Sequence, residues 1–552
     1  MSLNSLVASF KQYAGNFSRR DLFRTGSLLA IPALSAKRAA AAPPPPTPST
    51  TGGLQVGPNI YESIGVRPFI CGTGTLTVNS GTLELPEVRA AMEAATQHMV
   101  QLDELMDAVG KRLAELTGAE FGMVSAGCAA AITHATSACL VGGNPDQHIK
   151  LPHPEFLAKD QVIIPKHSRN NYDAAIRATG VRIIEVESAQ ELEAAIGPRT
   201  AMIYIFAGPR ADSGSPSFEE ITRIAKQRNV PVLTDAAAEG LTIPNIHLQR
   251  GSTLVAYSGG KQLRGPQCSG LLLGRKDLVK AAWVSSAPHH GFSRNMKVGK
   301  EEIIGLLAAV EVFVKRDEKA YWQDMVDRLD VIGKRVSSIP GVTYETRPPG
   351  AGLSNRSAGL SVRWEPAKLG ITGEEVVHIL NTTDPRILVG GGRGAQNGIS
   401  VSGFNLGPGH ERIVADRLFE VLSAKHTLKT PEAPKPPASD VSGQWDVHIE
   451  YAASASKHSL SLEQQGARIQ GVHQGDFLAR DLTGTMNGDK VQFRSSLPER
   501  EVGNAITYSF SGTVNGDTMS GDLDLGEYLT AKWSAKKHQY AQQQRGGQDR
   551  QL

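Results

Sequence analysis

The stretch VAYSGGKQLRGPQCSG, residues 255–270, places one lysine, Lys261, between an apolar run and a loop of glycine, proline and other small residues. Continuous apolar runs are typical of strands that are buried on both faces of a parallel sheet. Ligands of open α/β sheets bind beyond the carboxyl ends of such strands. Small neighbours let the backbone approach a ligand closely, so Lys261 is a candidate for binding or catalysis. Taken alone, it is better explained as a surface lysine on a loop.

Short β-rich runs precede and follow this stretch and alternate with helical segments. The pattern predicts an α/β fold with a mainly parallel seven-stranded sheet. The runs are 122–125, 162–165, 181–186, 201–206, 230–235, 253–257 and 270–273. Apolar residues at three- to four-residue spacing predict a helical segment over 86–116, and a second long helical segment is predicted from Glu301 to Leu329 or beyond.

The composition changes several times along the chain. Alternating apolar residues and two Asn-Gly-Asp turns, at 487–489 and 515–517, predict an antiparallel β-barrel or sandwich after a proline-rich linker. The expected order is a large domain with an N-terminal arm (54–315), a smaller α+β domain (316–426), the linker (427–440), the all-β domain (441–536) and a disordered tail (537–552).

The N-terminal segment differs from the rest. Arg19 and Arg20 precede an apolar run that is too short to span a bilayer, and an alanine-rich stretch follows. This arrangement resembles a twin-arginine export signal over 1–42, with a proline-rich spacer over 43–53. Because the segment resembles an export signal, we expect a periplasmic or secreted protein without a stable membrane span. The twin-arginine route carries folded proteins, so a cofactor can be bound before export. The alternative is a disordered basic tail that contains two arginines by chance.

Charge and cysteine content argue against a nucleic-acid-binding protein and against a disulfide-rich protein. The 58 lysines and arginines against 55 aspartates and glutamates give a net charge of +3, so a nucleic-acid partner is not expected. The four cysteines, Cys71, Cys128, Cys139 and Cys268, are widely spaced and form no C-x-x-C pair. No disulfide framework and no metal site are predicted.

Two more polar sites stand at predicted strand ends. Asp235 closes VPVLTD, and the turn Ser125-Ala126-Gly127-Cys128 joins a strand to a helix. Alone, the aspartate is an ordinary helix cap and the turn a tight connection. Together with Lys261 they meet the needs of pyridoxal phosphate, namely a Schiff-base lysine, a carboxylate for the pyridine nitrogen and a phosphate cradle at a helix N-terminus. A lysine amine freed by the substrate is also the natural base for the Cα proton.

These residues carry a family resemblance. SGGKQLRGPQCSGLLLGRKDLV, residues 258–279, resembles the lysine loop of the selenocysteine synthase-like branch of fold-type I pyridoxal-phosphate enzymes. Similar segments between about residues 65 and 422 match relatives of the D-glucosaminate-6-phosphate ammonia-lyase type. They are GTGTLTVNSGTLELPEVRAAM, LTGAEFGMVSAGCAAAITHATSACL, VPVLTDAAAE and MKVGKEEIIGLLAAVE.

The resemblance implies an aspartate-aminotransferase-like large domain and an active site at a subunit interface, in a homodimer or higher homo-oligomer. It makes Lys261 the Schiff-base lysine and Asp235 the partner of the pyridine nitrogen. The further residues that it assigns are Ser125, Gly127, Cys128 and Ser258 for the phosphate, His167 for stacking on the ring, and Arg264, Arg294 and Lys297 for the substrate anion. The last three are equally compatible with ordinary surface charges.

The expected function is therefore a pyridoxal-phosphate lyase that performs α,β-elimination on a small amino acid or amino-sugar acid. The same chemistry leaves a racemase, an aldolase or a β-replacement transferase open, because the fate of the carbanion depends on substrate orientation. A tRNA substrate is not expected, since the segment before the core resembles an export signal and the charge is nearly neutral. A third alternative is an exported, non-catalytic binding protein whose β-domain contacts the cell envelope.

Overall fold

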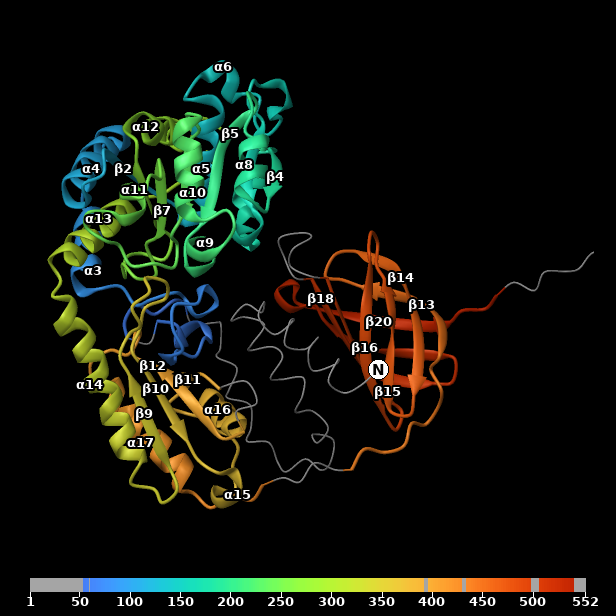
Figure 1. Ribbon diagram of the computed structural model, residues 1–552. Helices are drawn as coiled ribbons and strands as arrows, with labels where there is room; N and C mark the ends of the chain where they lie inside the picture. Colours follow the sequence, from blue (N-terminus) through green and yellow to red (C-terminus); the bar gives the residue numbers. More distant parts are fainter. Residues whose placement is uncertain (1–52, 59, 392–395, 429–432, 498–505, 541–552) are drawn as a thin grey trace, which may run out of the picture. The chain divides into compact units, whose positions relative to one another are not determined.

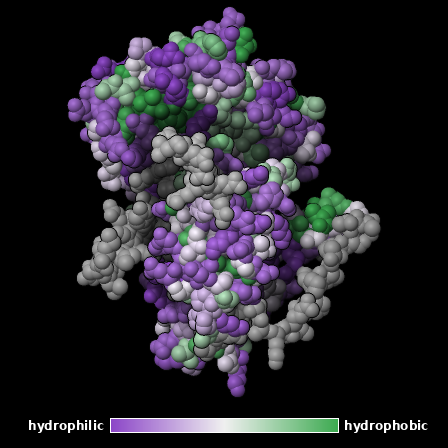
Figure 2. All heavy atoms as spheres, turned by 90° about the vertical axis from the view of Figure 1, so that its right-hand side faces the viewer, coloured by the Kyte–Doolittle hydropathy of each residue, from purple (hydrophilic) through white to green (hydrophobic). Residues whose placement is uncertain are grey.

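The computed structural model describes residues 53–58, 60–391, 396–428, 433–497 and 506–540. The predicted export signal, nearly all of the proline-rich spacer and the end of the tail lie outside these residues. The described chain forms two compact units, one before and one after residues 429–432. Within it, no helix combines the length and apolar character that crossing a membrane requires. The face in Figure 2 is mainly hydrophilic, with apolar side chains gathered in a few patches.

The first unit contains the predicted mainly parallel, seven-stranded sheet (Figure 1). Its strand order is β2-β8-β7-β6-β5-β3-β4, and only β8 runs antiparallel to its neighbours. The strands are β2 Phe121–Ser125, β3 Gln161–Pro165, β4 Arg182–Val186, β5 Thr200–Phe206, β6 Val232–Asp235, β7 Leu254–Ser258 and β8 Gly270–Gly274. The seven predicted runs are thus confirmed within one or two residues.

Helices cover both faces of this sheet, which explains its continuous apolar strands. Helices α5 (Cys128–Val141) and α12 (Lys276–Val284) lie on one face, and α8 (Ala189–Ala195) and α10 (Phe218–Gln227) on the other. Alternation along β5 sends Met202 and Tyr204 into the core beside α5, whereas Ile203 and Ile205 join the core beside α10. Tyr204 therefore faces the α5 side, where the candidate site lies.

Each of the two long predicted helical segments is interrupted by a cap. The first is split into α3 (Pro86–Thr96) and α4 (Leu102–Thr117), because the Gln101 side chain accepts hydrogen bonds from the backbone N–H groups at the start of α4. The second is split into α13 (Lys300–Lys315) and α14 (Glu318–Val336), where Asp317 accepts from the N–H of Ala320 at 3.0 Å. A prediction of continuous helices is wrong at these two points, since spacing alone does not reveal a cap inside an apolar pattern.

A smaller lobe follows the sheet. Its three-stranded antiparallel sheet has the order β12-β10-β9, and α14 and α17 pack side by side against it (Figure 1). The strand β1 from the N-terminal arm pairs in parallel with β11, so the arm contributes to this lobe as well. The bounds are β1 Ile70–Gly72, β9 Thr343–Arg347, β10 Gly359–Arg363, β11 Ile387–Val389, β12 Gly398–Ser402, α16 Gly373–Thr382 and α17 His410–Ser423. Short helices elsewhere in this unit are α6 Pro145–His148, α7 Ala174–Arg177, α9 Pro209–Ser213, α11 Ile246–Gln249 and α15 Pro366–Leu369.

The second unit is a closed antiparallel barrel of eight strands, which decides between the predicted barrel and sandwich. Neighbouring strands follow chain order, and β13 closes the ring by pairing with β20. Both predicted Asn-Gly-Asp turns are present, with Gly488 at φ 61° and Gly516 at φ 57°. The strands are β13 Gly443–Glu450, β14 Ala455–Gln465, β15 Arg468–Gln474, β16 Ala479–Asn487, β17 Lys490–Ser496, β18 Thr507–Asn515, β19 Thr518–Asp524 and β20 Thr530–Lys537.

Candidate active site

Asp235 ends β6 as a buried carboxylate, 1% exposed, with three protein donors. Its Oδ2 accepts a hydrogen bond from the Tyr204 hydroxyl at 2.8 Å. Its Oδ1 accepts from the N–H of Ala237 at 3.0 Å and from the thiol of Cys128 at 3.6 Å. Burial raises the pKa of the Asp235 carboxyl, and the Tyr204 hydrogen bond is the largest effect that opposes the rise. The carboxylate is therefore held in place by three segments that are far apart in the sequence.

Lys261 lies in the loop after β7 and is partly buried. Its positive charge also opposes the rise in the pKa of Asp235 and of the Cys128 thiol, so the amine lies within electrostatic reach of both. Its Nζ is 5.9 Å from the centroid of the Tyr172 ring. Lys261 and Asp235 thus lie within electrostatic reach of each other, and their roles stay predictions.

Helix α5 exposes only its beginning. From Ala130 to Val141 every residue is buried, whereas Ala129 is exposed and Gly127 is partly exposed. Gly127 caps the helix at φ 108°, a conformation that favours glycine, and no side chain caps the first turn. N–H groups at such a helix start attract anions. This turn is the best-placed phosphate cradle near Asp235.

Two of the predicted phosphate ligands use their side chains differently. The Ser125 hydroxyl is fully buried and donates to the carbonyl oxygens of Gly127 (2.9 Å) and Gly270 (3.2 Å), so it closes the turn. The Cys128 thiol points to Asp235, which leaves only its backbone N–H for an anion. The predicted phosphate-binding role of Ser125 stays a prediction. Ser258, at the end of β7, is partly exposed, and its hydroxyl has no partner in the described part of the chain.

His167 lies just after β3 and its ring is fixed. One ring nitrogen, Nε2, is 2.9 Å from the carbonyl oxygen of Pro216, and Nδ1 is 3.1 Å from the Ser168 hydroxyl. The ring packs against Gly214, where a Cβ would lie 2.7 Å from the ring carbon Cδ2. A stacking role for His167 stays a prediction.

The three predicted anion-binding residues fall into two groups. Arg264, at φ 56°, donates from Nε and Nη2 to the carbonyl oxygen of Leu83 at 3.2 and 3.1 Å. It therefore fastens the Lys261 loop to the N-terminal arm. Arg294 and Lys297 are exposed, and within the described chain their side chains make no hydrogen bond or ion pair. No contact found there connects them to Lys261 or Asp235.

The N-terminal arm and the smaller lobe both pack against the site. A Cβ at Gly81 of the arm would lie 2.8 Å from the carbonyl oxygen of Gly260, next to Lys261. A loop of the smaller lobe bonds to the segment after Asp235, with the N–H of Asn355 donating to the carbonyl of Ala238 at 2.7 Å. The arm thus contacts the Lys261 loop, and the smaller lobe contacts the segment that follows Asp235.

The sequence interpretation missed three residues around this centre. Tyr204 stands between Asp235 and Asn170, whose Nδ2 donates to the Tyr204 oxygen at 3.2 Å. Tyr172 lies near Lys261. A tyrosine inside the apolar run AMIYIF was the available signal for Tyr204, and Asn170 and Tyr172 belong to the same loop as His167.

Known proteins similar to this chain are enzymes. A 5'-C-glycyluridine monooxygenase-decarboxylase of Streptomyces sp is 31% identical over 379 residues, 66% of this chain and 92% of the relative. A D-glucosaminate-6-phosphate ammonia lyase of Salmonella typhimurium is 28% identical over 331 residues, 58% of this chain and 86% of the relative. An L-seryl-tRNA(Sec) selenium transferase of Proteus mirabilis is 28% identical over 288 residues, 46% of this chain and 58% of the relative.

A solved structure agrees with these relatives. The structure titled D-glucosaminate-6-phosphate ammonia-lyase matches with a TM-score of 0.60 and 26% identity, over 67% of this chain and 99% of that chain. No protein-family model matches. With a relative 31% identical and matched over 92% of its length, the chain belongs to the selenocysteine synthase-like group of fold-type I pyridoxal-phosphate enzymes, which contains lyases and related transferases.

Proposed function

We propose that this enzyme catalyses α,β-elimination on a small amino acid or amino-sugar acid. The β-substituent leaves, and water hydrolyses the resulting enamine to ammonia and a 2-oxo acid. The observation that best supports this proposal is that Lys261 lies within electrostatic reach of the buried Asp235, beside the open N-terminus of helix α5. The likeness to an ammonia lyase over 86% of that relative supports elimination over other fates of the substrate.

The residues present fit pyridoxal phosphate. Burial raises the pKa of Asp235 when only protein surrounds it, so a positively charged ring nitrogen would supply the missing counter-charge. The uncapped first turn of α5 and the Ser258 hydroxyl would hold the phosphate. Lys261 would attach the cofactor. When bound, the cofactor supplies an electron sink for the electron pair that deprotonation leaves on the substrate Cα.

The protein's own groups have distinct tasks in this proposal. Once the substrate amine has replaced it, Nζ of Lys261 takes the proton from the substrate Cα. Asp235 would keep a proton on the ring nitrogen of the cofactor, while Tyr204 and the Ala237 N–H fix the position of its carboxylate. Arg294 and Lys297 remain the candidates for binding the substrate anion, because Arg264 is already bonded to the arm.

An absorbance spectrum with borohydride tests the cofactor and its lysine. The purified protein should show a visible band that borohydride abolishes, and peptide mapping should find the added mass on Lys261. Lys261→Ala should lack the band, whereas Lys319→Ala, an exposed lysine of α14, should keep it. A band that survives Lys261→Ala would overturn the assignment.

A panel of β-substituted amino acids and amino-sugar acids tests the reaction. We expect ammonia and 2-oxo acid in equal amounts from at least one member of the panel, and neither with Lys261→Ala. Recovery of the enantiomer, an aldehyde or a β-substituted product instead would favour the racemase, aldolase or β-replacement alternative.

A second candidate function is oxidative decarboxylation. The monooxygenase-decarboxylase relative supports it, since it is 31% identical and 92% of its length is matched. Oxygen consumption with release of carbon dioxide from a glycyl-bearing nucleoside, in the absence of ammonia release from the panel, would select this candidate.

We also propose a homo-oligomer, supported by exposed apolar side chains on and near the N-terminal arm. Val56 is 89% exposed, Val78 75% and Met99 94%. Burying such side chains between subunits is favourable. Light scattering should show at least a dimer, and Met99→Asp should shift it towards monomer.

Export by the twin-arginine route stays a proposal that rests on Arg19 and Arg20. A fusion of residues 1–53 to a reporter that must fold before export tests it. Replacing both arginines by lysine should leave the reporter in the cytoplasm. Unchanged export of the double variant would refute the proposal.

A further inference from the structure

The two ends of the barrel differ in their connections. At one end, three connections have two residues each, at 466–467, 488–489 and 516–517. At the other end lie the longer connections 451–454, 475–478 and 525–529, which we call the long-loop end. In a barrel with strands in chain order, alternate connections fall at the same end. Short turns close a barrel tightly, whereas longer loops are where binding residues are usually found.

The side chains that face the inside of the barrel also differ between its two ends. Near the short turns it is filled by buried apolar side chains, such as Trp445, Leu462, Met486 and Met519. At the long-loop end, a group of polar side chains joins apolar ones such as Ile449 and Leu523. The polar group consists of Tyr451, Ser456, His458, His473, Arg480, Ser495 and Tyr508.

Most of these polar groups satisfy one another. The Ser456 hydroxyl is 3.0 Å from Nε2 of His458, Nδ1 of His458 is 2.8 Å from Nε2 of His473, and Nδ1 of His473 is 2.6 Å from the Ser495 hydroxyl. Burial lowers the pKa of both imidazoles, so neither adds positive charge at neutral pH. The chain of hydrogen bonds holds this part of the wall rigid.

Arg480 is the exception. Its guanidinium carbon lies 4.9 Å from the centroid of the Tyr508 ring, and both Nε and Nη1 are buried without an acceptor in the described residues. Asp476, a nearby carboxylate, is half-exposed and lies 3.7 Å from Nε2 of His458, with no ion pair to Arg480. Buried charged donors without acceptors cost free energy. Among the described residues of this end, Arg480 therefore has no counter-ion.

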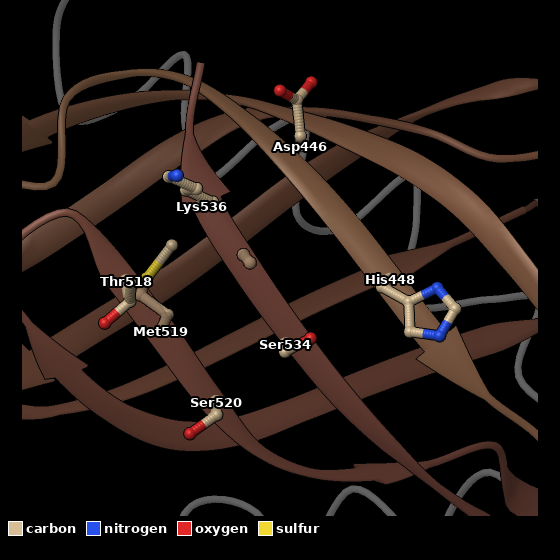
Figure 3. A pocket seen from close by; sticks show the side chains of 8 residues that line it. Asp446, His448, Thr518, Met519, Ser520, Ser534 and Lys536 are labelled. Carbon is tan, nitrogen blue, oxygen red and sulfur yellow. The ribbon is translucent and has the colours of Figure 1, made fainter. Parts of the chain in front are cut away.

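The pocket on the outer face of the barrel contains no comparable deficit. The open pocket in Figure 3 is lined by Asp446, His448 and Lys536, whose exposed side chains project from the outside of the strands. Asp446 already pairs with His538 at 3.0 Å. The charges there are paired or solvated, so the interior site is the stronger candidate.

We propose that the long-loop end binds an amphipathic monocarboxylate, whose carboxylate pairs with Arg480 and whose apolar part lies against Phe477 and Leu529. These two side chains are 93% and 70% exposed on loops of the same end. Among the described residues of this end, one arginine beside neutral imidazoles and Asp476 favours a singly charged anion over a phosphate. Arginine–carboxylate pairs are strong and directional, and eight-stranded barrels can hold one small ligand. The apolar core below His473 is filled, so the carboxylate enters no deeper than Arg480.

Calorimetric titration of the full-length protein with decanoate tests the proposal. We expect saturable binding, about tenfold or more weakened by Arg480→Met and unchanged by Arg468→Met, an exposed arginine near the short turns. Decanol, which has the same tail without the charge, should bind much more weakly. Equal binding of decanoate by Arg480→Met and the wild type, or of decanol and decanoate by the wild type, would overturn the proposal.

Gly475→Ala provides a test that keeps the arginine. A Cβ at Gly475 would lie 2.5 Å from Nη1 of Arg480 and would displace the flexible end of that side chain. Decanoate binding should fall while the thermal unfolding midpoint changes little. Should Arg480→Met fail to fold, this variant decides: unchanged decanoate affinity in Gly475→Ala would refute the pairing with Arg480.

Discussion

Asp235 in the sheet unit and Arg480 in the barrel are both charged groups with buried polar atoms, but they differ in their hydrogen-bond partners. Asp235 receives three donors, from β5, from α5 and from the backbone that follows it. Arg480 has two buried nitrogens with no acceptor in the described chain. The first charge is positioned by the protein itself, and the second lacks a counter-ion.

The difference separates two ways of building a site. Donors fixed around Asp235 keep its carboxylate in one orientation before any ligand arrives, as electrostatic preorganisation requires. Around Arg480 the polar side chains of the barrel interior are ordered by hydrogen bonds, yet the guanidinium is unpaired. This arrangement favours ligand binding over catalysis. If this comparison holds, changes around Asp235 should affect catalysis, and changes around Arg480 should affect ligand affinity alone.

The largest effect is expected for Asp235→Asn. The variant keeps the shape and removes the negative charge, so kcat/KM should fall by about 100- to 1000-fold, as is typical when one fixed electrostatic contact is lost. Steady-state kinetics on the substrate found in the panel would measure it. Asp416→Asn, an exposed carboxylate of α17, is the matched control and should retain full activity. Wild-type kinetics in Asp235→Asn would remove Asp235 from the mechanism.

Tyr204→Phe should have the next largest effect. It removes the 2.8 Å donor to Asp235 and leaves the ring in the core. A hydrogen bond to a charged group contributes about 1.5–3 kcal/mol, so the free energy of unfolding should fall by about that amount. Urea unfolding followed by circular dichroism measures it. Tyr257→Phe, which removes the hydroxyl bonded to Asn245 at 2.7 Å, should cost less because no charge is involved.

Much of this arrangement could be predicted from the sequence. The seven strands are short, apolar and bounded by turn residues, so each was found within one or two residues. Lys261, Asp235 and the Gly127 turn follow from the rule that strand ends carry ligands. The Asn-Gly-Asp turns of the barrel follow from local turn chemistry.

The remaining features depend on contacts between distant segments. The residues of AMIYIF alone do not predict that Tyr204 faces α5 and contacts Asp235. This contact follows from the strand order of the sheet and from side-chain alternation along β5. The roles of Ser125 and Arg264 likewise depend on acceptors in β8 and in the arm. The unpaired Arg480 becomes visible only when neighbouring strands are placed around it.

Acid should affect the barrel through its buried imidazoles. The folded-state pKa of His473 is lowered by burial and by the nearby charge of Arg480, so the unfolded chain takes up a proton first as the pH falls below about 6.5. The stabilisation is present above that pH and is lost below it, at up to about 1.4 kcal/mol per pH unit for one group. Unfolding of wild type and His473→Gln between pH 7 and 5 would measure the slope. An equal slope in both proteins would contradict the assignment.

The smallest effect is expected for Cys128→Ala, and Cys139→Ala is its matched control. Both thiols are buried in α5, so both variants lose similar packing, but only Cys128 donates to Asp235. A thiol is a weak donor and its distance of 3.6 Å is long, so Cys128→Ala should cost about 0.5 kcal/mol more than Cys139→Ala, at the low end for a hydrogen bond. Equal losses would mean that Tyr204 and the Ala237 N–H alone hold the carboxylate. A larger loss of unfolding free energy for Cys128→Ala, accompanied by lower kcat/KM, would mean that the thiol helps to position Asp235. Three donors, and not two, would then distinguish Asp235 from the unpaired Arg480.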